Sequence, residues 1–136
     1  MGAGCSGVLE AVKRVASSFE PGSGGYIAVF GSVAEGRCGP LSDVDLVVKG
    51  LGLEDAGRLV EAVEAATRRR VEVVFVERAG LPLLYEALAR SVFVAGDYWA
   101  YVEDKWRVVV EWLDFVEAYE RMHRAYRRRV LGGDRA

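Results

Sequence analysis

The chain has 136 residues and a formal net charge of −2, so its length suits one compact domain and its charge provides no general basic field for nucleic acid. Hydrophobic residues make up 51% and charged residues 28%, which excludes a largely disordered protein. No apolar run approaches the length that a membrane-spanning helix needs, and no secretory signal pattern is present. We therefore predict a cytoplasmic location, with neither a membrane nor nucleic acid as a partner.

Two further features of the composition bear on the cellular setting. Cys5 and Cys38 are far apart and lack the spacing of metal ligands, so in a cytosolic chain they favour two free thiols over a disulfide. The chain contains no Asn and no Gln, and Arg outnumbers Lys by 15 to 3. The loss of thermolabile amides indicates a thermophilic source.

The first half of the chain predicts a helix and two strands. Apolar residues recur on one helical face over residues 5–19, which predicts an amphipathic helix that ends at the glycine-rich segment 21–25. Residues 26–30 form a short apolar run typical of a buried strand, and a second strand is expected over 43–48. Only about a dozen residues separate the two strands, too few for a helical crossover, so we expect them to be antiparallel.

The second half predicts an alternation of helices and strands. In order we expect a helix over 53–67, a strand over 71–76, a helix started by Pro82, a short strand over 91–94 and a helical segment over 98–130 with one possible break. This alternation predicts an α/β or α+β fold, in which helices flank a small mixed sheet that is not a Rossmann sheet. We expect a single domain over 1–136, with the sheet and its helices in 1–97.

Residues that carry chemistry stand where three of the predicted strands begin or end. Asp43 and Asp45 begin the second strand, and alternation places their side chains on one face, about 7 Å apart along the chain. Two carboxylates so close repel each other unless a cation lies between them, and hard oxygen ligands suit Mg²⁺. Glu72 is a lone charge in an apolar strand, and sharing the metal would satisfy it.

Gly31 and Ser32, directly after the first strand, suit a phosphate. Gly31 has no Cβ to keep a phosphate from the backbone, and Ser32 can donate its hydroxyl and N–H at the start of a short helix. Each feature alone has a plainer interpretation: Gly-Ser as a turn, Asp43 as a turn cap, and Glu72 as an exposed residue of an edge strand. The combination in this order and spacing is what is specific.

The stretch Gly31-Ser32-Val33-Ala34-Glu35-Gly36, followed by Ser42-Asp43-Val44-Asp45-Leu46, resembles the signature of the DNA polymerase beta-like nucleotidyltransferase superfamily in its minimal members. The resemblance extends over residues 8–118. It implies that Asp43, Asp45 and Glu72 ligate two Mg²⁺ ions, with Glu72 as a further ligand or as the base on the acceptor hydroxyl. It also implies that Gly31 and Ser32 hold the triphosphate of ATP or another nucleotide.

Two residues depart from that family's pattern. Glu35 stands where the family often has Arg, which removes a phosphate contact that Arg37 would replace. Glu72 is longer by one methylene than the commoner Asp, and a misplacement of about 1 Å can cost about 100-fold in rate. The sequence therefore leaves three hypotheses open: an active nucleotidyltransferase that acts on a protein partner, a non-catalytic nucleotide-binding module that acts by occluding a partner, and, ranked last, transfer to a small molecule or tRNA.

The predicted C-terminal helix carries two apolar stripes, rotated from each other by about 100°. The first comprises Val102, Trp106, Val109, Leu113 and Val116, and the second comprises Trp112, Phe115, Tyr119, Met122 and Tyr126. One stripe suffices to cover a small sheet, so we expect the second to meet a protein partner or to form a homodimer. The resemblance implies that the partner is a HEPN-type ribonuclease toxin, which receives AMP from ATP on a tyrosine while this chain serves as the antitoxin.

Overall fold

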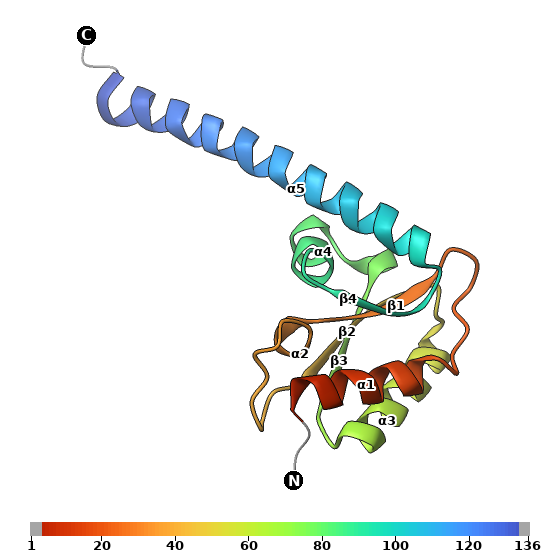
Figure 1. Cartoon of the computed structure of the whole chain (residues 1–136). Helices are drawn as coiled ribbons and strands as arrows, with labels where there is room; N and C mark the ends of the chain where they lie inside the picture. The colour runs from red at the N-terminus through yellow and green to blue at the C-terminus, as the bar shows by residue number, and fades with distance from the viewer. Residues whose placement is uncertain (1–3, 134–136) are drawn as a thin grey trace.

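A computed structural model describes residues 4–133, in which four strands form one sheet with helices on both faces (Figure 1). The strand order is β3-β2-β1-β4, with β1 Tyr26–Phe30, β2 Val44–Lys49, β3 Val71–Phe75 and β4 Val92–Gly96. β1 pairs in antiparallel fashion with β2 and with β4, whereas β3 runs parallel to β2. The predicted mixed sheet and its antiparallel first pair are confirmed.

The helices follow the predicted order closely. They are α1 Cys5–Ala16, α2 Gly31–Ala34, α3 Leu53–Thr67, α4 Leu81–Leu88 and α5 Tyr98–Arg127, with short turns η1 Val76–Arg78 and η2 Arg128–Gly133. α1 ends three residues before its predicted end, because the Ser17 and Ser18 hydroxyls donate to carbonyls of the last turn. α5 continues without a break from Tyr98 to Arg127. Within residues 4–133, no helix is both long and apolar enough to cross a membrane.

Alternation along the strands divides the core into two layers. On β1, Ile27 and Val29 pack in the cluster that contains α1 and α3, whereas Tyr26 and Ala28 pack in the cluster that contains α4 and α5. β2 alternates in the same way, and its Val47 belongs to the α4/α5 cluster. Asp45 and Lys49, two residues to either side of Val47, therefore face α4 and α5.

A disulfide joins the start of α1 to the loop after α2. Cys5 and Cys38 are bonded, with their Cα atoms 5.6 Å apart. The prediction of two free thiols is therefore wrong. The packing of α1 against α2 makes neighbours of two residues separated by 33 positions, which spacing alone does not reveal. The bond fastens the loop that leads to Asp43.

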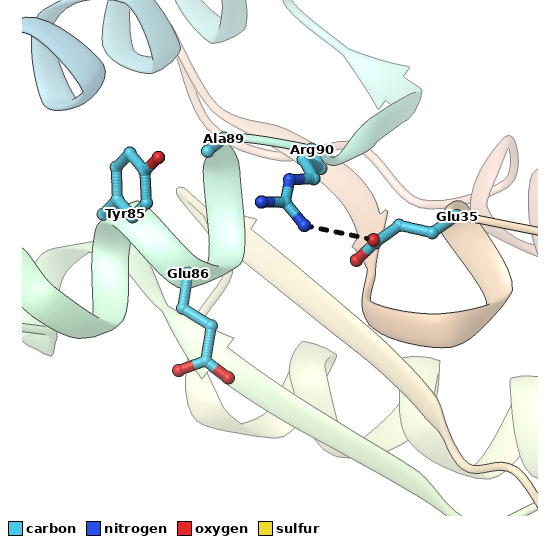
Figure 2. Close-up of a pocket in the computed structure, with 5 residues that line it drawn as sticks. All are labelled: Glu35, Tyr85, Glu86, Ala89 and Arg90. Carbon is cyan, nitrogen blue, oxygen red and sulfur yellow. Dashed lines mark hydrogen bonds and ion pairs between the residues drawn. The ribbon is translucent and has the colours of Figure 1, made fainter. Parts of the chain in front are cut away.

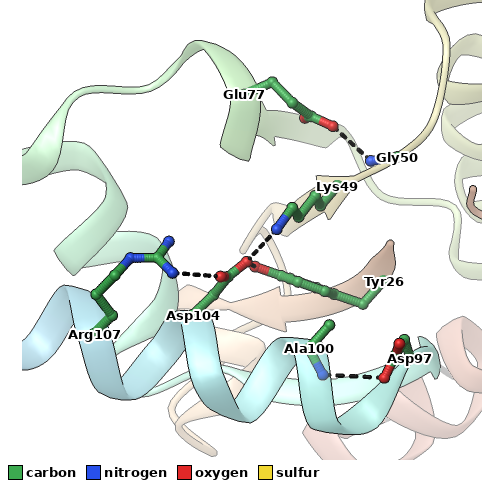
Figure 3. A network of polar contacts seen from close by, with 8 residues as sticks. All are labelled: Tyr26, Lys49, Gly50, Glu77, Asp97, Ala100, Asp104 and Arg107. Carbon is green, nitrogen blue, oxygen red and sulfur yellow. Dashed lines mark hydrogen bonds and ion pairs between the residues drawn. The ribbon is translucent and has the colours of Figure 1, made fainter. Parts of the chain in front are cut away.

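A buried carboxylate attaches α5 to the sheet (Figure 3). Asp104 is 3% exposed and accepts hydrogen bonds from the Tyr26 hydroxyl and the Lys49 ammonium, each at 2.8 Å. Arg107 lies 3.0 Å from its other oxygen. Burial opposes ionisation of Asp104, but the hydrogen bonds and positive charges outweigh it and lower the pKa of this carboxyl. Burial also raises the pKa of Tyr26, so its hydroxyl stays a donor.

The first stripe of α5 does not cover the sheet as predicted, whereas the partner predicted for the second stripe stays a prediction. The buried residues of α5 are Tyr101, Asp104 and Val108, whereas Trp106 and Leu113 of the first stripe are 70% and 57% exposed. The second stripe instead continues the buried face, beginning with Trp112, whose ring stacks on Tyr85 of α4 at 5.2 Å. Both stripes are equally apolar in sequence, so the side that meets the sheet is set by tertiary packing.

Candidate active site

Asp45 and Glu72 lie side by side on neighbouring strands. They are register partners in the parallel β2–β3 pair, so their side chains leave the same face of the sheet. Neighbouring strands are separated by about 4.8 Å, which places the two carboxylates within reach of a shared ion. Asp45 is half-buried and Glu72 is exposed.

Negative charge accumulates around Asp45. Burial raises the pKa of the Asp45 carboxyl, and the nearby charges of Glu72, Asp43 and Glu86 raise it further. Asp45 is thus held in surroundings that disfavour its charge, an arrangement that marks functional sites more often than structural ones.

Asp43 lies directly before β2, at the end of a well-held loop. Arg69 donates to the Gly39 carbonyl at 2.8 Å and to the Ser42 carbonyl at 2.9 Å. The Ser42 hydroxyl accepts from the Gly39 N–H at 2.7 Å, which closes the turn. These bonds, together with the disulfide at Cys38, determine where Asp43 leaves the loop.

Gly31 forms the wall of the site beside Asp45. It follows β1 directly, begins α2, and has a φ of 75°, in the left-handed region that favours glycine. A Cβ at this position would collide with the Asp45 carboxylate. Ser32 is the next residue, and its carbonyl accepts from the Arg37 N–H at 2.9 Å, so α2 turns the chain back beside the site.

A cleft of about 370 Å³ opens at these residues. Of the six residues predicted from sequence, Gly31, Arg37, Asp45 and Glu72 line it, whereas Ser32 and Asp43 lie outside its lining. The lining also includes residues that sequence reasoning missed: Phe30, Glu35, Val73, Val74, Leu83 and Glu86. Leu83 and Glu86 come from α4, and the packing of that helix on the sheet had no sequence signal beyond their three-residue spacing.

The single arginine of the cleft is already paired. Arg37 lies 3.2 Å from Glu35, and its side chain is 66% exposed. Hydrogen bonds and charge from Arg37, and secondarily from Arg90, lower the pKa of Glu35. The cleft lining therefore holds four carboxylates against one guanidinium. A triphosphate entering without cations would meet net repulsion there.

A smaller pocket of about 200 Å³ adjoins the cleft along α4 (Figure 2). Its lining comprises Glu35, Tyr85, Glu86, Ala89 and Arg90, so it shares Glu35 and Glu86 with the cleft. Arg90 reaches toward Glu35, 3.4 Å away, and Glu86 points away from that pair.

The donor set at this end of the sheet fits a hard divalent cation. Asp43, Asp45 and Glu72 supply only carboxylate oxygens, which Mg²⁺ prefers, and a cation would relieve the repulsion that raises the pKa of Asp45. Across residues 4–133, however, no three His, Cys, Asp or Glu side chains already converge as a metal cluster. The carboxylates are therefore grouped but open, as in sites where a substrate phosphate completes the coordination of Mg²⁺.

Solved structures share this fold over nearly the whole chain. A chain of a toxin–antitoxin complex crystallised with AMP-PNP aligns with a TM-score of 0.59 at 14% identity, covering 90% of this chain and 97% of the other. A chain from a mutant of the MntA–HpeT toxin–antitoxin gives a TM-score of 0.61 at 12% identity, covering 91% and 98%. At these identities the likeness concerns the fold.

A third structure extends the comparison to a named organism. It contains a tri-AMPylated HEPN toxin from Shewanella oneidensis in complex with the MNT antitoxin, and aligns with a TM-score of 0.54 at 12% identity over 90% of this chain and 94% of the other. No curated protein sequence matches the chain significantly. The family described as "Nucleotidyltransferase domain" matches residues 9–94, which run from within α1 to within β4 and contain all the cleft residues. The chain therefore belongs to the nucleotidyltransferase domain family.

Proposed function

We propose that this nucleotidyltransferase transfers AMP from ATP, with Mg²⁺, to a hydroxyl of a protein partner. The observation that carries the proposal is the pairing of Asp45 with Glu72 across β2 and β3, beside the Cβ-free wall at Gly31. Phosphate and nucleotide chemistry needs positive charge at such a place, and the cleft residues provide mainly negative charge. Metal-bound ATP matches this cleft better than free ATP does.

Each site residue has a proposed role in the transfer. Asp43 and Asp45 hold Mg²⁺, and Gly31 and Ser32 receive the triphosphate, with Arg37 at its edge. Two bound Mg²⁺ ions would neutralise the triphosphate and lower the pKa of the attacking hydroxyl. The acceptor oxygen bonds to the α-phosphorus, the bond from that phosphorus to the β-bridging oxygen breaks, and pyrophosphate leaves. Glu72 completes the metal site or takes the hydroxyl proton.

The proposed acceptor is a HEPN-type toxin, with this chain as its antitoxin. Support comes from the three structural relatives, all of them toxin–antitoxin chains, one with AMP-PNP and one with an AMPylated toxin. The small pocket beside the cleft suits a protruding side chain such as tyrosine, because the Tyr85 ring lines it and Arg90, 74% exposed, offers donors at its rim.

The test is label transfer from ATP labelled at the α-phosphate. The full chain is incubated with Mg²⁺ and the product of any adjacent reading frame that encodes a HEPN-type protein, and that protein is expected to gain label on tyrosine. Asp45→Asn is expected to lower the rate by about 100-fold or more, because it removes a metal ligand. Glu61→Gln, an exposed carboxylate of α3 on the opposite face of the sheet, serves as the matched control and keeps the wild-type rate. Equal transfer by wild type and Asp45→Asn would remove the proposal.

A second candidate is a nucleotide-binding antitoxin that inhibits its partner by occlusion. The open arrangement of the carboxylates favours it, since no preformed metal cluster occurs in the described chain. In that case Asp45→Asn would still inhibit the toxin fully while transferring no label. Loss of inhibition in the same variant would leave the catalytic proposal as the account.

A further inference from the structure

The distal half of α5 extends past the sheet and the other helices (Figure 1). Its apolar side chains are open to solvent: Phe115 is 51% exposed, Tyr119 58%, Met122 71% and Tyr126 64%. Steps of four, three and four residues place all of them on one side of the helix. A contiguous aromatic surface of this kind marks an interface in a water-soluble fold.

The exposed stripe prolongs the face that the same helix buries against the sheet. Val108 is buried, Trp112 stacks on Tyr85, and the ring of Trp112 stacks in turn on Phe115 at 5.6 Å. The series continues from Phe115 to Tyr119 at 6.4 Å. The spacing from Val108 to Tyr126 alternates four and three, the 3.5-residue repeat of a helix that packs against another helix. The occupant of the stripe is therefore a helix.

The charges of the same segment identify which helix fits. Residues 111–120 contain four acidic residues and no basic one, and residues 121–129 contain five arginines and no acidic residue. A parallel copy would set acids against acids, whereas an antiparallel copy sets the acidic run of each helix against the arginines of the other. The helix is thus complementary to itself about a point near Tyr119 and Glu120.

We propose that two copies of this chain pair through the distal halves of α5, antiparallel and related by a two-fold axis. Trp112 and Phe115 of one copy then lie against Met122 and Tyr126 of the other, and Tyr119 lies near the axis. The inference is independent of AMP transfer, because the stripe contains none of the residues that line the cleft.

The first test is the mass of the full chain in solution, by light scattering after gel filtration and by sedimentation equilibrium. Wild type is expected to be a dimer at micromolar concentration. Tyr119→Asp is expected to raise the dimer Kd by about 30-fold or more, because it places a charge at the centre of the seam. Leu113→Asp is the matched control: Leu113 is 57% exposed against 58% for Tyr119, but it lies off the stripe, and this variant stays dimeric.

The second test addresses the antiparallel direction. Arg124→Glu with Arg127→Glu reverses two of the five arginines of residues 121–129 and is expected to weaken the dimer at low ionic strength, with a smaller effect in added salt. About an axis at Tyr119, Asp114 lies opposite Arg124 and Glu111 lies opposite Arg127. Adding Asp114→Arg and Glu111→Arg therefore restores opposite charges at these two positions and is expected to recover affinity. Circular dichroism verifies that each variant keeps its helix.

Several outcomes would overturn the proposal. A monomeric wild type would do so, as would equal loss of dimer in Leu113→Asp and Tyr119→Asp. So would a variant with all four charge reversals that recovers no affinity. A wild type that is monomeric alone but binds a toxin through Tyr119 would assign the stripe to a different protein. Label transfer measured on the same samples keeps the two proposals separate, since failure of transfer in an intact dimer concerns only the cleft.

Discussion

Two carboxylates on the α4/α5 face of the sheet have opposite surroundings. Asp104 meets Lys49, at the end of β2, together with Tyr26 and Arg107, and its pKa is lowered. Asp45, near the beginning of the same strand, meets Glu72, Asp43 and Glu86, and its pKa is raised. One end of β2 surrounds its carboxylate with the chain's own cations, and the other end gathers further carboxylates around its own.

This difference separates the part of the fold built for stability from the part available for chemistry. The Asp104 network joins α5 to β1 and β2 and leaves no buried polar side-chain atom unsatisfied among the described residues. The Asp45 group instead keeps like charges together, which costs folding free energy in the absence of a ligand. Strain of this kind is typical of binding and catalytic sites.

The largest expected effect is at the compensated end. Asp104→Asn removes the buried charge that pairs with the partly exposed Lys49 and Arg107, and leaves the buried Tyr26 hydroxyl with a weaker acceptor. We expect the free energy of unfolding to fall by about 3 kcal/mol. Urea unfolding followed by circular dichroism measures it, and a loss below about 0.5 kcal/mol, the range of ordinary surface substitutions, would contradict the role given to the network.

The same substitution at the other end is expected to have the opposite sign. Asp45→Asn relieves repulsion from Glu72, Asp43 and Glu86 and should stabilise the metal-free chain. The gain is expected to be about 0.5 kcal/mol after allowance for solvent screening, or about 2 °C in Tm. Differential scanning calorimetry of both proteins, without and with Mg²⁺, tests this prediction. Added Mg²⁺ should raise the Tm of wild type but not the Tm of Asp45→Asn.

The smallest effect is a difference in pH dependence. The ordinary pKa of an Asp carboxyl is 3.8, and that of Asp45 is raised above it. Wild type should therefore lose stability relative to Asp45→Asn as the pH rises from 3.8 through the raised pKa. The lowered value of Asp104 contributes stability that is present above 3.8 and lost as pH falls through that lowered pKa. Urea unfolding of wild type, Asp45→Asn and Asp104→Asn between about pH 3 and pH 7 measures both effects. As the pH rises, the stability of wild type relative to Asp45→Asn should fall, whereas its stability relative to Asp104→Asn should rise. If the stability of all three proteins depended on pH in the same way, the opposite surroundings of Asp45 and Asp104 would be wrong.

Much of this fold follows from local patterns. α3 and β1 have their predicted bounds because apolar periodicity and glycine breaks define them within a few residues. The Asp45–Glu72 pair could also be predicted from the sequence, because strand alternation fixes the face of each side chain once the strands are known.

What the sequence did not reveal depends on contacts between distant elements. Asp104 looked like any acidic residue of a helix, because its partners Tyr26 and Lys49 lie 78 and 55 positions away. The disulfide depended on α1 packing near α2, and the roles of the two α5 stripes depended on where the sheet ends. Glu86 entered the site only because α4 lies over the start of β2.

Calorimetric titration of ATP into the full chain, with Mg²⁺ and with EDTA, measures whether nucleotide binding at the cleft requires a divalent cation. The uncompensated carboxylates around Asp45 are expected to make ATP binding depend on Mg²⁺, and Asp45→Asn is expected to abolish that dependence. ATP binding of equal strength in EDTA and Mg²⁺, or unchanged Mg²⁺-dependent binding in Asp45→Asn, would contradict the account.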